Sequence, residues 1–337
     1  PLTYTWGFTD PVEIEGKMHA GQFPRPLGPY GHWLQERGLY ERFHQDYLAR
    51  KAKGWDIAAH DSVLPAEFFA DTYIGDRAVQ WLDGITHEYP WHLFVSFAGP
   101  HDPFDPPTPY ADRYRNAAMP PPLPVGDALG RNGRRMETSR YSAEQVLLTR
   151  RQYCASITAI DDAIGRILAA LDRRGEADRT IVVFASDHGE LLGDHGLYTK
   201  SAPYESCLRV PLIVAGPGVE QGASDALVEL LDVNATLCDL AGVPPLEHVD
   251  ARSFAPVLRG TAREHRSEGV ALLQRLRVIR TATYKLVQNV NAETELYDLA
   301  ADPGEQRNIA PREPDRCRAL AARLLERLTR PVFGDSR

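Results

Sequence analysis

The chain has 337 residues, of which 43% are hydrophobic and 25% are charged. This balance is typical of a globular protein and excludes a disordered or collagen-like chain. A net charge of −8 argues against a general nucleic-acid-binding surface. No apolar stretch approaches the roughly 18 residues of a membrane-spanning helix. Four scattered cysteines without CxxC spacing argue against a disulfide scaffold or a thiolate zinc site.

Helices and short buried strands alternate along the first two thirds of the chain. Residues 1–60 show little periodicity and are expected to form loops with short helices around 30–41, whereas the apolar spacing predicts helices over 66–84 and 143–173. In the helix 143–173, one apolar stripe is expected from Ile157, Ile160, Ile164, Ile167 and Leu171. Apolar runs predict strands at 92–97, 180–185, 210–214 and 227–231. Helix followed by strand, repeated, indicates an α/β fold with a mainly parallel central sheet flanked by helices.

After residue 246 the pattern changes to short strands separated by turns. Strands are predicted at 277–281, 284–288 and 295–299, followed by a helix over 313–328. We therefore expect an α/β catalytic domain over residues 1–245 and a small α+β subdomain over 246–337, with an antiparallel sheet and one helix.

Asp187 and His188 come directly after the predicted strand 180–185. Ligands of open α/β sheets bind at the carboxyl ends of the strands. A carboxylate oxygen beside an imidazole nitrogen suits a divalent cation. The alternative is that Asp187 caps a following helix and that His188 is a surface residue.

Two further polar loops leave predicted core strands. The loop 193–200 ends in Lys200, whose point charge could hold an anionic group, although a lone lysine is more often simply solvated. The loop 98–104 carries His101, and its prolines should stiffen it. A histidine held there could protonate a leaving group, or it could only bond to the backbone nearby.

Taken in order, these segments resemble the sulfatase family of the alkaline-phosphatase-like superfamily. The similarity extends from near residue 1 to about residue 310, and as an ordered set the motifs are specific, although each is weak alone. The similar pieces are 94–104, 186–197, Lys200, Tyr204, Glu205, 209–214, Arg280, Thr281, 284–286, 296–299, Asp302, Pro303, Glu305 and Asn308.

The resemblance implies a role for each candidate residue. Asp187 and His188 would be two ligands of an active-site cation, usually Ca²⁺ in sulfatases and more often Mn²⁺ in a related branch that hydrolyses phosphonate or phosphate esters. Lys200 would contact the sulfate oxygens and stabilise the charge that develops during transfer. His101 would bind on the ester-oxygen side and assist departure of the leaving group. Many sulfatases have Asn where His188 stands, which leaves the metal open.

Lys17 and His19 form a second pair of candidate catalytic residues. The segment 16–19 is similar to a Gly-Lys-x-His motif of the family, in which both side chains contact the sulfate. In relatives a Gly-Phe-Asp-like element follows this motif, whereas here the similar segment 6–10 precedes it. A coincidental match is the alternative.

The chain also departs from the family. It has no Cys-x-Pro-x-Arg or Ser-x-Pro-x-Arg motif, whose first residue becomes the formylglycine nucleophile, and no early Asp-Asp metal pair. The segment 207–211 contains Cys, Arg and Pro in the wrong order. Both elements lie N-terminal in relatives. We therefore expect a sulfatase without about its first hundred residues, a size that fits ordinary domains, and we expect no turnover by residues 1–337 alone.

The leading hypothesis is a metal-dependent sulfuric ester hydrolase that resembles arylsulfatases and acts on a small-molecule or carbohydrate sulfate ester. A phosphonate monoester or phosphodiester hydrolase on the same scaffold is the alternative among enzymes. A non-catalytic binding protein that kept the fold is the alternative outside them. Neither nucleic acid nor a membrane span is expected.

Overall fold

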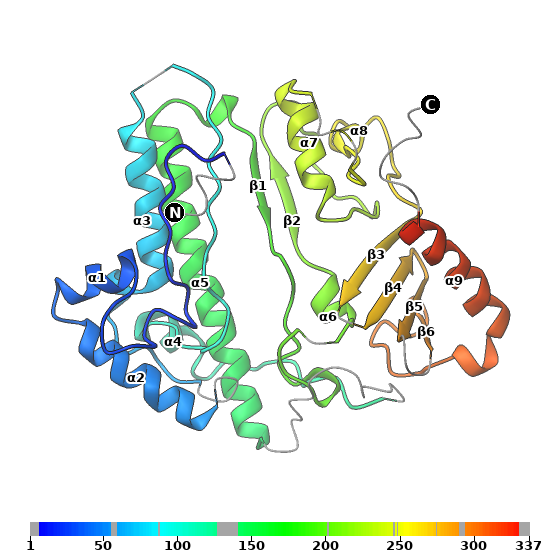
Figure 1. Ribbon diagram of the computed structural model, residues 1–337, viewed down its shortest axis with the longest axis horizontal. Coiled ribbons are helices and arrows are strands. Elements are labelled where there is room, and N and C mark those ends of the chain that lie inside the picture. Colours follow the sequence, from blue (N-terminus) through cyan, green and yellow to red (C-terminus); the bar gives the residue numbers. More distant parts are fainter. Residues whose placement is uncertain are drawn as a thin grey trace. The chain divides into compact units, whose positions relative to one another are not determined.

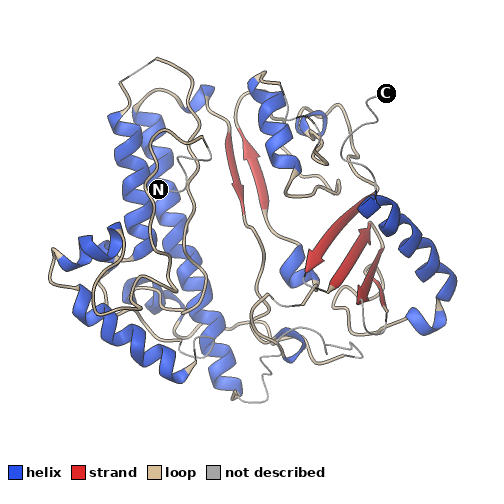
Figure 2. Cartoon of the chain, in the orientation of Figure 1, coloured by secondary structure: helices blue, strands red, loops and turns tan. Residues whose placement is uncertain are grey.

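The computed structural model describes residues 7–54, 59–86, 88–126, 141–200, 202–244, 247, 249–273, 275–289 and 294–329. The chain divides into two units: Pro1–Pro121 with Ser139–Asp178, and Pro122–Thr138 with Arg179–Arg337. Among the described residues, every strand lies in the second unit, whereas helices and loops make up the first (Figure 2). The predicted domain boundary at residue 245 falls inside the second unit and stays a prediction.

The first unit is built on helices. They are α1 (Pro29–Gln35), α2 (Tyr40–Lys53), α3 (Ala70–Gly84), α4 (Thr108–Tyr114) and α5 (Ala143–Arg173), with a 3₁₀ turn at Ala66–Phe68. The short helices expected around 30–41 are α1 and the start of α2, and Gly38 turns the chain between them with a φ of 69°. Within the parts of the chain that the structure describes, no helix is long and apolar enough to cross a membrane.

Helices α3 and α5 lie side by side (Figure 1). They approach closely at Gly75, where an added Cβ would lie 2.9 Å from the Cβ of Ala163. This close packing buries small residues of α5, while Ile157 from the predicted stripe is 45% exposed. The α5 prediction was therefore correct in its extent but wrong about Ile157, because small side chains allow the closest helix contact.

The predicted strand 92–97 is not a strand in the structure, although all of its residues are described. Its side chains alternate between exposed and half-buried, and Phe94 is 68% exposed. The short apolar run indicated a buried strand, but an apolar run alone does not supply a neighbouring strand to pair with.

In the second unit, β1 (Val182–Ala185) and β2 (Leu212–Ala215) pair with each other in antiparallel register. The strand positions agree with the predictions, but the direction differs from the parallel order that we expected. A parallel pair needs a crossover of a dozen or more residues, usually a helix. In the described residues of the connection, the helical elements are the 3₁₀ turn Asp194–Gly196 and the short α6 (Glu205–Leu208), and neither forms a crossover helix.

The second unit also contains a four-stranded antiparallel sheet in the order β3-β4-β5-β6, with α9 beside it (Figure 1). The elements are β3 (Glu268–Leu273), β4 (Leu276–Thr281), β5 (Tyr284–Asn289), β6 (Glu295–Asp298) and α9 (Pro314–Thr329). Leu320 and Leu324 of α9 pack on Ile279 and Leu286 of the sheet. The predicted antiparallel sheet and terminal helix are confirmed, and β3 is an additional strand.

Two further helices, α7 (Asp232–Ala241) and α8 (Ala255–Leu258), precede this sheet. The strand predicted at 227–231 is wrong: only Leu227 forms an isolated bridge, to Arg266. Glu229 donates its backbone N–H to the carboxylate of Asp232 at the start of α7, which ends the extended backbone there.

Candidate functional site

Asp187 and His188 follow β1 and face each other. The backbone N–H of His188 donates to Oδ1 of Asp187 at 2.9 Å, and His188 Nε2 lies 3.4 Å from Asp187 Oδ2. His188 Nδ1 lies 2.9 Å from the carbonyl oxygen of Gly189, so a proton on Nδ1 is donated to that carbonyl. The Nε2 lone pair then faces a carboxylate oxygen, an arrangement that favours a cation between them. The next helical turn begins only at Asp194, so Asp187 does not cap a helix.

This donor pair fits part of a divalent-cation site. Its oxygen and nitrogen are ligands of the kind that such cations take, and the Asp187 side chain is 84% exposed and therefore accessible. In the described part of the chain, no group of three or more His, Cys, Asp or Glu side chains could hold a metal ion. The assignment of Asp187 and His188 as metal ligands stays a prediction.

Gly189 brings this segment against α6. Its N–H donates to the carbonyl of Cys207 at 2.9 Å, and an added Cβ would lie 1.9 Å from the carbonyl oxygen of Ser206. No side chain fits in that space, so only glycine allows the two segments to pass so closely. The position of His188 therefore depends on the segment that follows Lys200.

Lys200 lies on a loop that we call the lysine loop, residues 190–200 and 202–205. The loop packs on the four-stranded sheet through Leu191, Leu197 and Tyr204, which share a core cluster with Val278 and Tyr297. The packing places Lys200 on a rigid base within the second unit. Its expected contact with a substrate anion stays a prediction.

His195 of the lysine loop stacks on Tyr204, with ring centroids 3.7 Å apart. Burial lowers the pKa of His195 to about 4, and this effect outweighs the opposing one of the neighbouring Asp194. The ring is therefore neutral at pH 7, and it stabilises the loop by stacking.

A buried lysine anchors the end of the lysine loop. Lys285 of β5, which is fully buried, donates its Nζ to the carbonyl of Pro203 at 2.7 Å. The same ammonium pairs with the buried carboxylate of Glu305 and lies 3.3 Å from Glu205 Oε1. Glu305 also accepts the backbone N–H of Glu205 at 2.7 Å. Sequence analysis assigned no role to Lys285, Glu205 or Glu305, although they lie in segments that resemble the family.

Cys207 is 4% exposed in the core beneath this loop. Burial raises the pKa of its thiol to about 12, so almost no thiolate exists at neutral pH. This agrees with the motif analysis, in which the order of residues 207–211 did not fit a nucleophile.

In the first unit, His101 lies on a loop that we call the histidine loop, residues 99–105. Its Nδ1 is 2.8 Å from the carbonyl oxygen of Asp102 and 3.0 Å from the Asp102 carboxylate. The side chain is about one third exposed, which leaves it accessible to a ligand. His101 and the pair Asp187–His188 belong to different units, so their convergence on one substrate stays a prediction.

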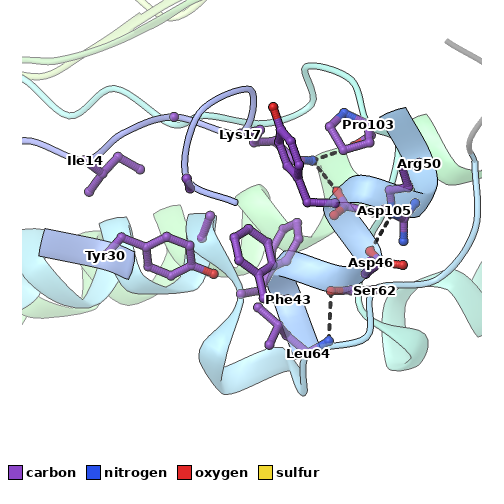
Figure 3. A pocket seen from close by; sticks show the side chains of 15 residues that line it. Ile14, Lys17, Tyr30, Phe43, Asp46, Arg50, Ser62, Leu64, Pro103 and Asp105 are labelled. Carbon is purple, nitrogen blue, oxygen red and sulfur yellow. Dashed lines mark hydrogen bonds and ion pairs between the residues drawn. The ribbon is translucent and has the colours of Figure 1, made fainter. Parts of the chain in front are cut away.

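Lys17 is buried, and its Nζ is turned toward the histidine loop (Figure 3). It donates to the carbonyl of Pro103 at 2.8 Å and lies 2.5 Å from Oδ1 of Asp105. The cavity beside it is about 20 Å³, room for roughly one water molecule. These contacts indicate that Lys17 holds the histidine loop, and they do not favour contact between Lys17 and a substrate anion. His19, its partner in the predicted motif, is exposed.

Comparison with known proteins identifies the family. Residues 22–243 match the Sulfatase family, and residues 193–331 match the C-terminal family of N-sulphoglucosamine sulphohydrolase. The chain belongs to the sulfatase family. The resemblance that the ordered motifs indicated is thereby confirmed.

Two curated relatives show the extent of the similarity. The choline-sulfatase of Rhizobium meliloti (strain 1021) is 35% identical over 246 residues, which cover 67% of this chain and 48% of that protein. The multifunctional alkaline phosphatase superfamily protein PehA of Trinickia caryophylli is 30% identical, over 88% of this chain and 67% of that protein. The chain thus spans about half to two thirds of the length of these relatives.

Solved structures confirm the expected fold class. The phosphonate monoester hydrolase of Agrobacterium radiobacter superposes with a TM-score of 0.74 at 25% identity, covering 90% of this chain and 70% of that one. A structure described as a complex with its substrate D-glucosamine-2-N,6-O-disulfate gives a TM-score of 0.69 at 23% identity, covering 79% and 72%. The alkaline-phosphatase-like fold is therefore shared.

Proposed function

We propose that the protein hydrolyses sulfuric esters of small molecules or carbohydrates. One observation carries the proposal: the Sulfatase match over residues 22–243 includes both loops and the donor pair after β1. His101, Asp187, His188 and Lys200 thus all lie in the part of the chain that matches the family. The relatives named as sulfatases support the same reaction class.

Asp187 and His188 would hold a divalent cation through Oδ2 and Nε2, which already face each other. A cation bound there would polarise the sulfate group. Calcium is the expected ion, and manganese is expected if the protein belongs with the phosphonate hydrolases. We assign the nucleophile to no residue of this chain, because it has no Cys-x-Pro-x-Arg or Ser-x-Pro-x-Arg motif for a formylglycine.

Lys200 and His101 would act on opposite ends of the ester bond. The ammonium of Lys200 would stabilise the negative charge on the sulfate oxygens, which grows during transfer. Nδ1–H of His101 donates to Asp102, so a doubly protonated His101 would give its Nε2 proton to the leaving oxygen and become neutral.

A second candidate is hydrolysis of phosphonate monoesters or phosphodiesters. The structural similarity to the Agrobacterium radiobacter phosphonate monoester hydrolase and the identity to the multifunctional PehA support it. Both reactions would use a divalent cation, the lysine and the acid, so the fold does not separate them.

The test compares an aryl sulfate with an aryl phosphonate, using protein expressed from its complete coding sequence and supplied with Ca²⁺ or Mn²⁺. Faster turnover of the sulfate is expected, and a clear preference for the phosphonate would favour the second candidate. Lys200→Ala should lower turnover by about 10²-fold, whereas Lys53→Ala, an exposed lysine of α2, should not. No turnover of either ester with either metal would contradict both candidates.

A further inference from the structure

The histidine loop is irregular backbone, and two buried charged side chains hold its two ends. Asp71 of α3 is fully buried, and its Oδ1 accepts the N–H of Gly99 at 2.8 Å, just before His101. Lys17 donates to the carbonyl of Pro103 at 2.8 Å, just after it. Because burial makes such contacts costly to break, both ends of the loop should be held firmly.

The geometry at Gly99 shows how close this contact is. An added Cβ would lie 2.4 Å from Asp71 Oδ2, so a larger residue would displace the carboxylate. Burial raises the pKa of Asp71, although Lys17 and the N–H of Gly99 act in the opposite direction. Lys17 is therefore near enough to Asp71 to stabilise its charge as well.

The neighbours of Lys17 surround its ammonium group on several sides. Asp105 Oδ1 lies 2.5 Å from Nζ, and the ring centroid of Phe69 lies 5.2 Å from it. The side chains of Lys17 and Asp105 are 5% and 8% exposed. Figure 3 shows the ammonium between the carbonyl of Pro103 and the carboxylate of Asp105, with Arg50 and Asp46 forming a separate pair.

We infer that Lys17, together with Asp71 and Asp105, holds the histidine loop in the conformation that presents His101 to the substrate. Lys17 is then a positioning residue, one that acts on the reaction through the backbone at Pro103. The inference rests on the proposed function, in which His101 gives a proton to the leaving oxygen. All of its contacts lie within the first unit.

The first measurement needs no activity. Hydrogen exchange of the backbone amides in residues 99–105 is compared between the wild-type protein, expressed from its complete coding sequence, and Lys17→Met. Exchange in this loop should rise at least about tenfold, because the contact that holds Pro103 is gone. Unchanged exchange in Lys17→Met would overturn the inference.

A double variant separates positioning from stability. Lys17→Met with Asp105→Asn removes both charges of the ion pair, and the loss of a whole buried pair is often nearly neutral for stability. Asp71, whose pKa burial already raises, can then take up a proton. The double variant should therefore keep a melting temperature close to wild type while its loop exchange stays raised. Recovery of the wild-type exchange rates by the double variant would contradict the inference.

The second measurement is the dependence of turnover on the leaving group. Proton donation matters most for a poor leaving group, so phenyl sulfate should lose more turnover than 4-nitrophenyl sulfate when the acid is misplaced. His101→Ala removes the acid and should lower turnover of phenyl sulfate by about 10²-fold. The Lys17 variants should also lower turnover of phenyl sulfate more than that of 4-nitrophenyl sulfate, but by only about tenfold.

Arg174→Met is the matched control. Arg174 also lies in the first unit beside a carboxylate, Glu176, and donates to a backbone carbonyl, that of Leu82 at 2.6 Å. It should leave the leaving-group selectivity unchanged. If His101→Ala is selective but the Lys17 variants behave as Arg174→Met does, the inference fails and the proposed function stands. If His101→Ala is not selective, the assigned role of His101 fails, and with it the inference.

Discussion

In the first unit Lys17 donates to the carbonyl of Pro103, and in the second unit Lys285 donates to the carbonyl of Pro203. Each proline follows a candidate catalytic residue by two or three positions, His101 in one case and Lys200 in the other. Both lysines are buried and both pair with a buried carboxylate. The same arrangement thus supports two irregular loops in two separate units.

The two lysines are carried by different kinds of backbone. Lys17 lies in a turn and pairs with the single carboxylate of Asp105, which belongs to the loop it holds. Lys285 lies on β5, where the register with β4 and β6 sets its position, and it faces two carboxylates. A regular sheet therefore defines the geometry of the lysine loop, whereas the histidine loop depends more heavily on individual polar contacts.

The largest expected effect is that of Lys285→Met. It would leave Glu305, 2% exposed, without its cation, and an unpaired buried charge costs about 3–5 kcal/mol of unfolding free energy. Burial already raises the pKa of Glu305, so protonation of this carboxyl will recover part of the loss. Urea unfolding followed by circular dichroism, with hydrogen exchange in β4 and β5, measures the effect.

The double variant Lys285→Met with Glu305→Gln is the control, and it should cost less than the single change because no lone charge remains. If Lys285→Met lowers the unfolding free energy by less than about 1 kcal/mol, water must reach the pair. That result would contradict the burial described here.

Lys17→Met should cost less, about 2–3 kcal/mol of unfolding free energy, because Asp105 at 8% exposure is closer to water than Glu305 at 2%. Asp71 nearby can also take up a proton, since burial already raises its pKa. Trp33, Trp81 and Trp91 lie in the first unit, so tryptophan fluorescence during urea unfolding reports on this change. A cost above that of Lys285→Met would show that the lysine in the turn stabilises the fold more than the lysine on β5, against the comparison made here.

The difference between the two units also shows what the sequence could predict. Local patterns were sufficient for α5 and for three strands of the C-terminal sheet, because periodicity and turn residues are local properties. The Ser142–Gln145 capping box at the start of α5 is a further local signal that could have sharpened its first residue. The antiparallel direction of β1 and β2 depends on which segments meet in space, and local patterns do not contain that information.

The candidate site divides in the same way. Asp187 and His188 could be found because they follow an apolar run, and the ends of strands are where ligands bind. Lys285 and Glu305 could not be assigned a role, since a lysine within a strand ordinarily indicates a solvent-facing position. Their importance comes from tertiary burial, which brings together residues far apart in the sequence.

A third prediction concerns acid stability in the second unit. The pKa of His195 is about 4 in the folded protein and about 6.5 when exposed, so the unfolded chain binds more protons between these values. Stability should therefore fall as the pH drops from about 6.5 to 4, by up to about 1.4 kcal/mol per pH unit. His195→Asn, which tolerates the backbone φ of 55°, should flatten this dependence.

The measurement is urea unfolding of both proteins at several pH values between 7 and 4. Only the difference between the two curves is attributed to His195, because carboxylates also titrate in acid. Parallel curves would contradict the assignment of a neutral, buried ring.

The smallest effect is expected from Arg280→Met, at about 0.5 kcal/mol of unfolding free energy. Arg280 lies 3.3 Å from Glu205 and is 26% exposed, so water screens the pair. It also stands directly opposite Lys285 in the register of β4 and β5, and its removal relieves a repulsion between like charges. Loss of the pair and relief of the repulsion nearly cancel, whereas Glu205 keeps its contact with Lys285.

Urea unfolding of Arg280→Met in low and high salt tests this prediction, since screening by salt should shrink the small effect further. An effect as large as that of Lys285→Met, or one insensitive to salt, would contradict this prediction. Arg280 would then stabilise the lysine loop together with Lys285 and the carboxylates that face it.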